Sequence, residues 1–307
     1  MIIQAYFRQY YAERFEIGPD DRSFMVPNEK PPMEVERLHF ALSEDGRHFE
    51  PLNQNRPVWD RWLRDPFIQR GPDGFWHMLA TEGWNGQSAI YARSRDLLAW
   101  ESRDLPLATG LFSDGVQAQN IWAPEWIYDA ATQEYFLFWS SSFEDWGWKK
   151  SRIFYSRTRD WKTFTPARAL FEPPYSVIDG TLTFHDGTWF LFHKEEEFSP
   201  ATGERRAIRL AIASTLEGPY LPFKGPLNNG QITPVITEGP SVLCDPQSPG
   251  WLLYYDHCME GEFGLSHSTD LFTWNEVKDA RFPPAARHGS FFMVSAEEAA
   301  RLKSTLC

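Results

Sequence analysis

The sequence predicts an all-β protein folded as a five-bladed β-propeller, and three observations support this fold class. First, a unit made of a strand ending in a small hydroxyl residue, a polar turn and an aromatic strand occurs five times. Second, a further hairpin with an aromatic-rich strand alternates with this unit, which gives four strands in each period. Third, the first unit lacks that further hairpin, while the chain ends with one unpaired strand. The hydroxyl residues are Ser43, Ser94, Thr158, Ser214 and Ser268, at spacings of 51, 64, 56 and 54 residues, as expected for propeller blades.

This pattern divides the chain, residues 1–307, into the five blades of a single domain. Four blades are predicted to be continuous, at residues 64–102, 121–166, 177–223 and 236–277. The fifth combines residues 1–55 with 286–295, and its strand at 3–11 is expected to pair between 289–294 and 38–42, because both edges would otherwise stay open. A helical turn is predicted at Ala296 to Leu302, with Ser295 as its N-cap. A β-sandwich with irregular loops is the alternative fold.

Composition narrows the class of function. The chain carries 30 Lys and Arg against 42 Asp and Glu, and its net charge of −12 is the wrong sign for a surface that follows nucleic-acid phosphates. Aromatic residues make up 16% of the chain, so disorder is excluded because these rings must be buried or used. No apolar stretch approaches the roughly 20 residues of a membrane span, and no export signal is visible. We therefore expect cytoplasmic action, or secretion if a leader has been removed.

Candidate functional residues lie where the innermost strand of each blade begins. In a propeller these starts meet at one mouth of the central channel, although they are far apart in the sequence. Four of the five starts contain a carboxylate, and a neighbouring Gly or Pro interrupts the strand and turns the side chain towards the channel. Such a ring of acids with one His predicts a site. The starts are Arg64-Asp65-Pro66, Trp122-Ala123-Pro124-Glu125, Ile178-Asp179-Gly180, Thr237-Glu238-Gly239-Pro240 and Arg287-His288-Gly289.

A ring of this kind suits the cleavage of a glycosidic bond. The reaction needs an acid for the leaving oxygen and a base for water, and a third carboxylate can raise the pKa of the acid. The Trp content fits the same chemistry, since aromatic rings stack on the C–H faces of sugars. Candidate ligand-contacting rings near inner-strand ends or in long loops are Trp84, Trp122, Trp126, Trp146 and Trp148, whereas Trp100, Trp161 and Trp274 are expected in the core.

The order of these motifs along nearly the whole chain resembles glycoside hydrolase family 43, whose members are five-bladed propellers that cleave arabinofuranosides and xylosides with inversion. The resemblance implies that Asp65 is the general base, that Glu238 is the general acid, and that Asp179 raises the pKa of this acid and orients it. It also implies that His288 faces the channel near a water or a structural calcium ion, and no other cofactor is expected. Glu125 replaces the Asp often found after Trp-Ala-Pro in the family, which affects the expected substrate wall.

We therefore expect an oligosaccharide-binding pocket and neither a nucleic-acid nor a membrane partner. The expected activity is that of an exo-acting, inverting α-L-arabinofuranosidase on arabinose-containing oligosaccharides. A β-xylosidase or β-galactofuranosidase stays open, because a change of pocket wall exchanges these substrates. A carbohydrate-binding propeller is the non-enzymatic alternative, and the sequence leaves the oligomeric state open. The predicted substrate-binding residues are Arg64, Trp84, Trp122, Glu125, Arg287 and His288.

Overall fold

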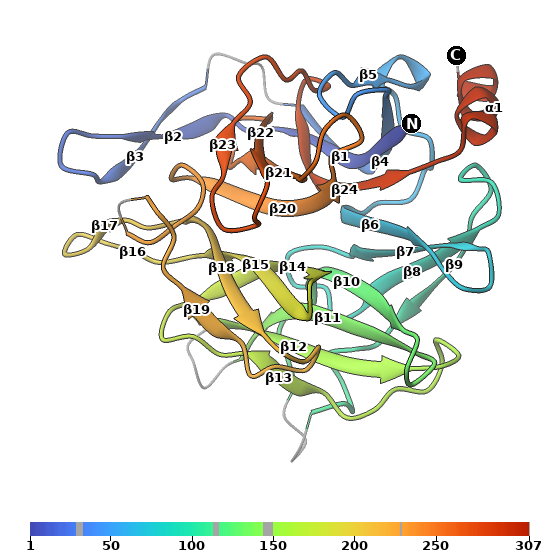
Figure 1. The fold of residues 1–307 in the computed structure, drawn as a ribbon, viewed down its shortest axis with the longest axis horizontal. Helices are drawn as coiled ribbons and strands as arrows, with labels where there is room; N and C mark the ends of the chain where they lie inside the picture. Colours follow the sequence, from blue (N-terminus) through green and yellow to red (C-terminus); the bar gives the residue numbers. More distant parts are fainter. Residues whose placement is uncertain (29–32, 113–116, 144–149, 228, 307) are drawn as a thin grey trace.

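The computed structural model describes residues 1–28, 33–112, 117–143, 150–227 and 229–306, and it contains five four-stranded antiparallel sheets arranged around a centre (Figure 1). Blade I consists of β6 (Arg64–Arg70), β7 (Trp76–Thr81), β8 (Ala89–Ser94) and β9 (Glu101–Leu105). Blade II consists of β10 (Trp122–Asp129), β11 (Glu134–Ser142), β12 (Ser151–Thr158) and β13 (Arg168–Phe171). Blade III consists of β14 (Val177–His185), β15 (Thr188–Glu195), β18 (Ala207–Ala213) and β19 (Leu221–Phe223). Blade IV consists of β20 (Thr237–Cys244), β21 (Trp251–His257), β22 (Glu262–Ser268) and β23 (Asn275–Glu276).

Blade V joins the two ends of the chain. Its strand order is β24 (Ala286–Met293), β1 (Ile2–Tyr10), β4 (Met33–Ser43) and β5 (Glu50–Pro51). Within β1, Ile3 pairs with Phe292 on one side and with Leu42 on the other. The inner strands β6, β10, β14, β20 and β24 contact one another in this order, and β24 contacts β6. The predicted five-bladed propeller, closed by the N-terminal strand, is therefore confirmed.

A side-chain-capped turn explains the recurring hydroxyl residue. In blade I, the Ser94 hydroxyl accepts a hydrogen bond from the backbone N–H of Leu97 at 2.9 Å, and Asp96 accepts from the next two N–H groups, also at 2.9 Å. This arrangement satisfies backbone donors that the strands leave unpaired. The same bonds recur in the turns that begin at Ser43, Thr158 and Ser268. The hydroxyl residue thus recurs in the sequence because the same tight turn, present in four blades, requires it.

Hydrophobic clusters fill the spaces between blades. One cluster joins Ile3 and Phe40 of blade V to Ile68 and Trp76 of blade I. Helix α1 (Ala296–Leu306) covers this cluster with two buried residues, Ala299 and Leu302. It begins as predicted and extends four residues further.

Two short hairpins lie outside the blades: β2 (Glu13–Ile17) with β3 (Ser23–Pro27), and β16 (Phe198–Ser199) with β17 (Gly203–Glu204). A 3-10 turn, η1 (Asn53–Asn55), follows β5. Across the described residues, no helix has both the length and the apolar character that a membrane span requires.

Candidate active site

A β-bulge at the start of each inner strand forms the site. In blade I, Arg64 pairs with Thr81 and Phe67 with Leu79, so two residues, Asp65 and Pro66, oppose one. Blades II to IV show the same shift, and the irregularity in blade V leaves His288 between two paired residues. Bulges bend the strand and redirect a side chain, here towards the mouth of the channel. The first bulge residue has a positive φ in four blades: 49° at Asp65, 43° at Ala123, 52° at Asp179 and 60° at Gly239.

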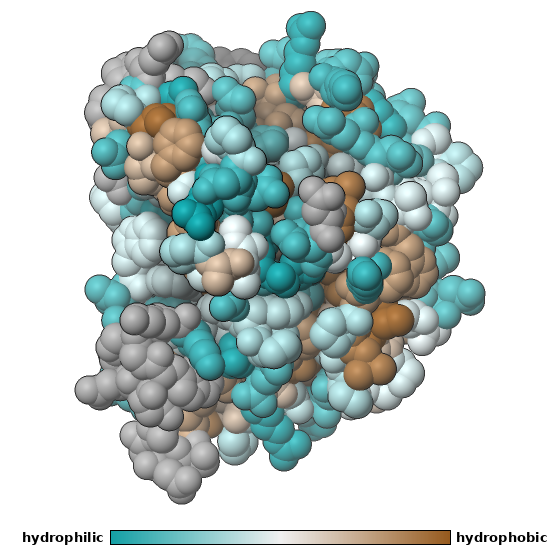
Figure 2. Space-filling view, turned by 90° about the vertical axis from the view of Figure 1, so that its left-hand side faces the viewer, coloured by the Kyte–Doolittle hydropathy of each residue, from teal (hydrophilic) through white to brown (hydrophobic). Residues whose placement is uncertain are grey.

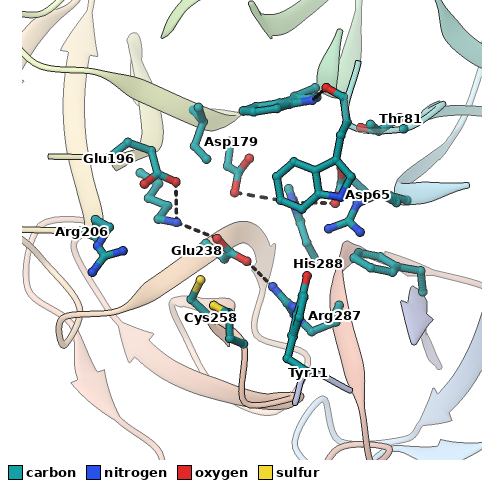
Figure 3. Close-up of a pocket in the computed structure, with 18 of the residues that line it drawn as sticks. Tyr11, Asp65, Thr81, Asp179, Glu196, Arg206, Glu238, Cys258, Arg287 and His288 are labelled. Carbon is teal, nitrogen blue, oxygen red and sulfur yellow. Dashed lines mark hydrogen bonds and ion pairs between the residues drawn. The ribbon is translucent and has the colours of Figure 1, made fainter. Parts of the chain in front are cut away.

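A cavity of about 510 Å³ opens at this mouth, within the usual range for small-molecule sites. Figure 3 shows Asp65, Asp179 and Glu238 directed into it from blades I, III and IV. Its lining residues come from all five blades and from the β2–β3 hairpin: Phe7, Tyr11, Phe15, Arg64, Asp65, Thr81, Gly83, Trp84, Trp122, Ile178, Asp179, Lys194, Glu196, Arg206, Glu238, Cys258, Met259, Arg287 and His288.

His288 lies between two of the three candidate carboxylates. Its Nδ1 is 3.5 Å from Asp65 Oδ1 and 3.7 Å from Asp179 Oδ2. The ring packs directly on Gly239, where an added Cβ would lie only 2.6 Å from His288 Cγ, so a side chain is excluded there. The N–H of Gly239 also donates a hydrogen bond to Asp179 at 3.1 Å. Burial raises the pKa of Asp179 to about 7; His288 opposes this shift, while Glu238 and Asp65 add to it.

Two cations hold the third carboxylate, Glu238. Lys194 Nζ donates to Glu238 Oε2 at 2.6 Å, and Arg287 binds the other oxygen. Burial by itself would raise the pKa of Glu238, but the charges of Lys194 and Arg287 outweigh burial and hold this pKa well below its usual range. The expectation that Asp179 keeps Glu238 protonated is therefore not met in this arrangement. Asp179 is the carboxyl with the raised pKa.

Two charged residues that the sequence reasoning missed organise this end of the pocket. Asp256 has 0% exposure, accepts from Arg287 Nε at 2.9 Å and accepts from the backbone N–H of His288 at 2.7 Å. Lys194 also contacts Glu196 at 2.7 Å. Both residues lie one position before the end of the second strand of a blade. Antiparallel pairing brings them beside the start of the inner strand: Asp256 pairs with Glu238, and Lys194 pairs with Ile178. A charge at the end of an otherwise apolar strand was the available signal.

The opposite end of the pocket is aromatic. Trp84, which is 59% exposed, lies edge-on to Trp122 with 5.7 Å between ring centroids, and the Trp122 indole N–H donates to the Trp84 carbonyl at 2.9 Å. The guanidinium of Arg64 lies 4.9 Å from the Trp84 ring and pairs with Glu36. The structure thus brings five of the six predicted substrate-binding residues, all except Glu125, to the cavity beside the three candidate catalytic acids.

Comparison with known proteins identifies the family. Residues 24–300 match the model of a family described as a probable glycosyl hydrolase domain, related to glycoside hydrolase family 43. The chain belongs to this glycoside hydrolase family.

Two relatives of this glycoside hydrolase carry names that refer to arabinose-containing substrates. It is 33% identical, over 293 aligned residues covering 71% of this chain and 90% of the relative, to "Arabinan endo-1,5-alpha-L-arabinosidase C" of Emericella nidulans. It is 27% identical, over 70% of its length, to an "Alpha-L-arabinofuranosidase" of Bifidobacterium longum subsp. longum, of which it spans 25%. The solved structure of a Penicillium chrysogenum α-L-arabinanase complexed with arabinobiose superimposes with a TM-score of 0.53 at 14% identity, over 94% of this chain and 88% of that one. This likeness supports the fold.

Glu125 does not belong to the pocket of this glycoside hydrolase, and its predicted role as a substrate contact is wrong. It is 5% exposed, is absent from the cavity lining, and interacts with Thr181 of blade III. Burial raises its pKa well above the ordinary value. The reason is the position of the bulge. In blade II the first bulge residue is Ala123, so Glu125 lies two residues beyond the position that Asp65 and Asp179 occupy in their blades.

The predictions for the other tryptophans have different outcomes. Trp126 is fully buried between blades I and II and does not reach a ligand. Trp161 and Trp274 are buried and Trp100 is partly buried against a core cluster, as predicted. Trp146 and Trp148 lie outside the described residues.

The donor set at His288 does not fit a calcium ion held by protein ligands. Calcium takes six to eight oxygen ligands. Within the part of the chain that the structure describes, no group of three or more His, Cys, Asp or Glu side chains is arranged to hold an ion. His288 directs Nδ1 towards two carboxylates instead.

Proposed function

We propose that this protein is an inverting, exo-acting glycosidase that releases a pentose, with α-L-arabinofuranosides as its first substrates. The observation that supports this most is the meeting of three acids and one His from four blades in a single cavity. The two relatives, named as an arabinan endo-1,5-α-L-arabinosidase and an α-L-arabinofuranosidase, point to arabinose-containing substrates. A β-xylosidase or a β-galactofuranosidase would use the same acids with a different wall.

In this proposal Asp65 activates water. Its carboxylate accepts a proton from a water molecule that attacks the anomeric carbon, and the neighbouring His288, 3.5 Å away, orients the carboxylate. The positive φ of 49° at Asp65 fixes the side chain in this direction at a strained backbone position. Strain of this kind is typical of residues whose orientation matters for chemistry.

Glu238 protonates the departing oxygen in the same step. Because Lys194 and Arg287 lower its pKa, a leaving group that enters this end of the pocket has to weaken at least one of these contacts before Glu238 carries a proton. Asp179 helps because its carboxyl accepts a hydrogen bond from the N–H of Gly239, which fixes the backbone next to Glu238. Asp256 positions Arg287 and the backbone of His288 by accepting a hydrogen bond from each.

A substrate panel tests this proposal. Nitrophenyl α-L-arabinofuranoside, β-D-xylopyranoside and β-D-galactofuranoside are offered to the protein and to the matched variant Asp65→Asn. We expect the arabinofuranoside to give the highest kcat/KM and the variant to lose this activity. Faster hydrolysis of either other glycoside replaces the substrate assignment. Hydrolysis of none of them, with retained binding of arabino-oligosaccharides, contradicts the enzymatic proposal and favours a carbohydrate-binding propeller.

A further inference from the structure

An arm outside the blades closes one side of the pocket. The arm, residues 11–28, contains the β2–β3 hairpin and leaves blade V after β1. In Figure 1 this hairpin projects away from the blades on the same side as the β16–β17 hairpin. Two arm residues, Tyr11 and Phe15, line the cavity. The family model begins at residue 24, so both residues precede the segment that it matches.

The arm is attached to the β16–β17 hairpin and the residues next to it, which lie between β15 and β18 of blade III. The N–H of Glu204 donates to the carbonyl of Asp21 at 2.6 Å, and Arg22 donates to the carbonyl of Pro200 at 3.1 Å. Arg206 donates to the hydroxyl of Ser23 at 2.6 Å. These bonds connect the arm, which leaves blade V, to residues 200–206, which lie between β15 and β18 of blade III. Figure 2 looks at this side of the molecule and shows hydrophilic side chains over much of it, with separate hydrophobic areas.

Arg206 joins the arm to the pocket. Its guanidinium lies 4.2 Å from the centre of the Phe15 ring, and its Nε donates to Glu204 at 2.8 Å. The side chain of Glu204 is 1% exposed and that of Arg206 is 15% exposed. Since a desolvated, hydrogen-bonded ion pair of this kind is broken only at considerable cost, Phe15 rests on a rigid support. Arg206 and Phe15 both line the cavity.

Phe15 and Arg206 form a wall of the pocket on the side of Glu238, the proposed acid. Figure 3 shows Arg206 and Glu196 beyond Glu238 when viewed from Asp65, with the Lys194 contacts between them. In glycoside hydrolysis the acid protonates the oxygen of the leaving group, so the leaving group lies on the side of the acid. A leaving group that extends past Glu238 therefore meets Phe15 and Arg206.

We infer that Phe15 and Arg206 form the binding site for the first sugar of the leaving group, and that the arm limits the leaving group to a short chain. This inference rests on the proposed function. The chemistry fits a sugar: an aromatic ring offers a surface for C–H groups, and Lys194, Glu196 and Arg206 offer polar contacts for hydroxyls. The substrate class is then disaccharides and short oligosaccharides, and long polysaccharide chains are disfavoured.

Leaving groups of different size test the inference. The substrates are the glycosyl fluoride of the released pentose, whose leaving group is a single atom, the disaccharide, the trisaccharide and the linear polysaccharide. For Phe15→Ala we expect about a 10-fold lower kcat/KM on the disaccharide, mainly through KM, because one aromatic contact is lost. The loss on the fluoride should be at least fivefold smaller. The ratio of trisaccharide to disaccharide turnover should rise, since the wall has been opened.

Phe24→Ala is the matched control. Phe24 lies in β3 of the same arm, is 48% exposed and does not line the cavity. It should leave every ratio unchanged, and Phe15→Tyr should restore the disaccharide activity. Equal effects of Phe15→Ala and Phe24→Ala, or equal wild-type rates per non-reducing chain end on disaccharide and polysaccharide, would overturn the inference. Failure of the wild-type protein on both the fluoride and the nitrophenyl glycoside would instead count against the proposed function.

Discussion

The two ends of the pocket hold their carboxylates in opposite ways. At the blade I end, Asp65 faces His288 at 3.5 Å beside the exposed ring of Trp84. At the blade IV end, Glu238 is bound by Lys194 and by Arg287, and buried Asp256 holds the arginine in turn. The two side chains are equally exposed, at 14% each, so the difference lies in their partners: Asp65 has a His and an exposed Trp beside it, whereas Glu238 lies in a network of charges.

This difference matches the two tasks of an inverting glycosidase. A base needs access to water and a fixed direction, and the strained bulge at Asp65 provides the direction. An acid needs a proton at the moment of bond cleavage, and the cations around Glu238 oppose this protonation. In the proposed mechanism the base end is therefore preorganised, whereas the acid end is completed by the leaving group.

The largest expected effect comes from Asp65→Asn. Water activation is required whatever leaves, so kcat/KM should fall by at least about 10² to 10⁴ on nitrophenyl glycosides and on natural oligosaccharides alike. Steady-state kinetics on both substrate classes check this, with the melting temperature as the control for folding. Survival of either class would mean that the base is not at this end.

Glu238→Gln should separate the two substrate classes. The variant lacks the proton donor, so natural oligosaccharides should lose about 10² to 10⁴ in kcat/KM, while nitrophenyl glycosides with good leaving groups lose much less. The same kinetic series measures both. Equal losses on both classes would remove the functional difference between the two ends.

Lys194→Met should shift the alkaline limb of the kcat/KM pH profile to higher pH. Since Lys194 lowers the pKa of Glu238, its removal should raise this pKa, and the acid should keep its proton to higher pH. The alkaline limb of the kcat/KM profile is then expected to move up by about one to three pH units. Lys194→Arg, which keeps the charge, serves as the control and should leave the limb close to its original position. A shift of the limb to lower pH would contradict the account of the acid end.

Trp84→Ala should have the smallest effect, and it acts on the aromatic end. Loss of one exposed stacking surface should raise KM about 10-fold with little change in kcat, because the ring contributes similar binding to ground state and transition state. Trp126 cannot substitute for Trp84, since it is buried in the core between blades I and II. A loss confined to kcat would place Trp84 in the chemical step instead.

The fold was predictable because its signals are local and repeated. A hydroxyl residue and an aspartate cap one turn in four blades, and their spacing reveals the period. The closure of blade V followed from counting strands and from the cost of open edges. The positions of Asp65, Asp179 and Glu238 in one cavity followed from the same period.

The errors at the site concern residues whose positions depend on how the strands pair, and the strand register cannot be read from the sequence. Glu125 was assigned to the pocket because it lies near a strand start, yet the bulge at Ala123 places it in the interior. Lys194 and Asp256 were not predicted because they lie on the second strands, β15 and β21, and only strand pairing brings them beside the starts of the inner strands. The contact of the arm with blade III is a long-range arrangement that no local pattern encodes.

The stereochemistry of the reaction tests the central claim most directly. Asp65 and Glu238 stand on β6 and β20, which are not neighbours in the ring, and inversion requires carboxyl groups roughly 6.5 to 9.5 Å apart so that a water fits between base and sugar. Proton NMR during hydrolysis of an aryl glycoside should show the anomer opposite to that of the substrate first, before mutarotation. First appearance of the retained anomer, or a glycosyl ester trapped on Asp65, would contradict the assignment of Asp65 as the base that activates water.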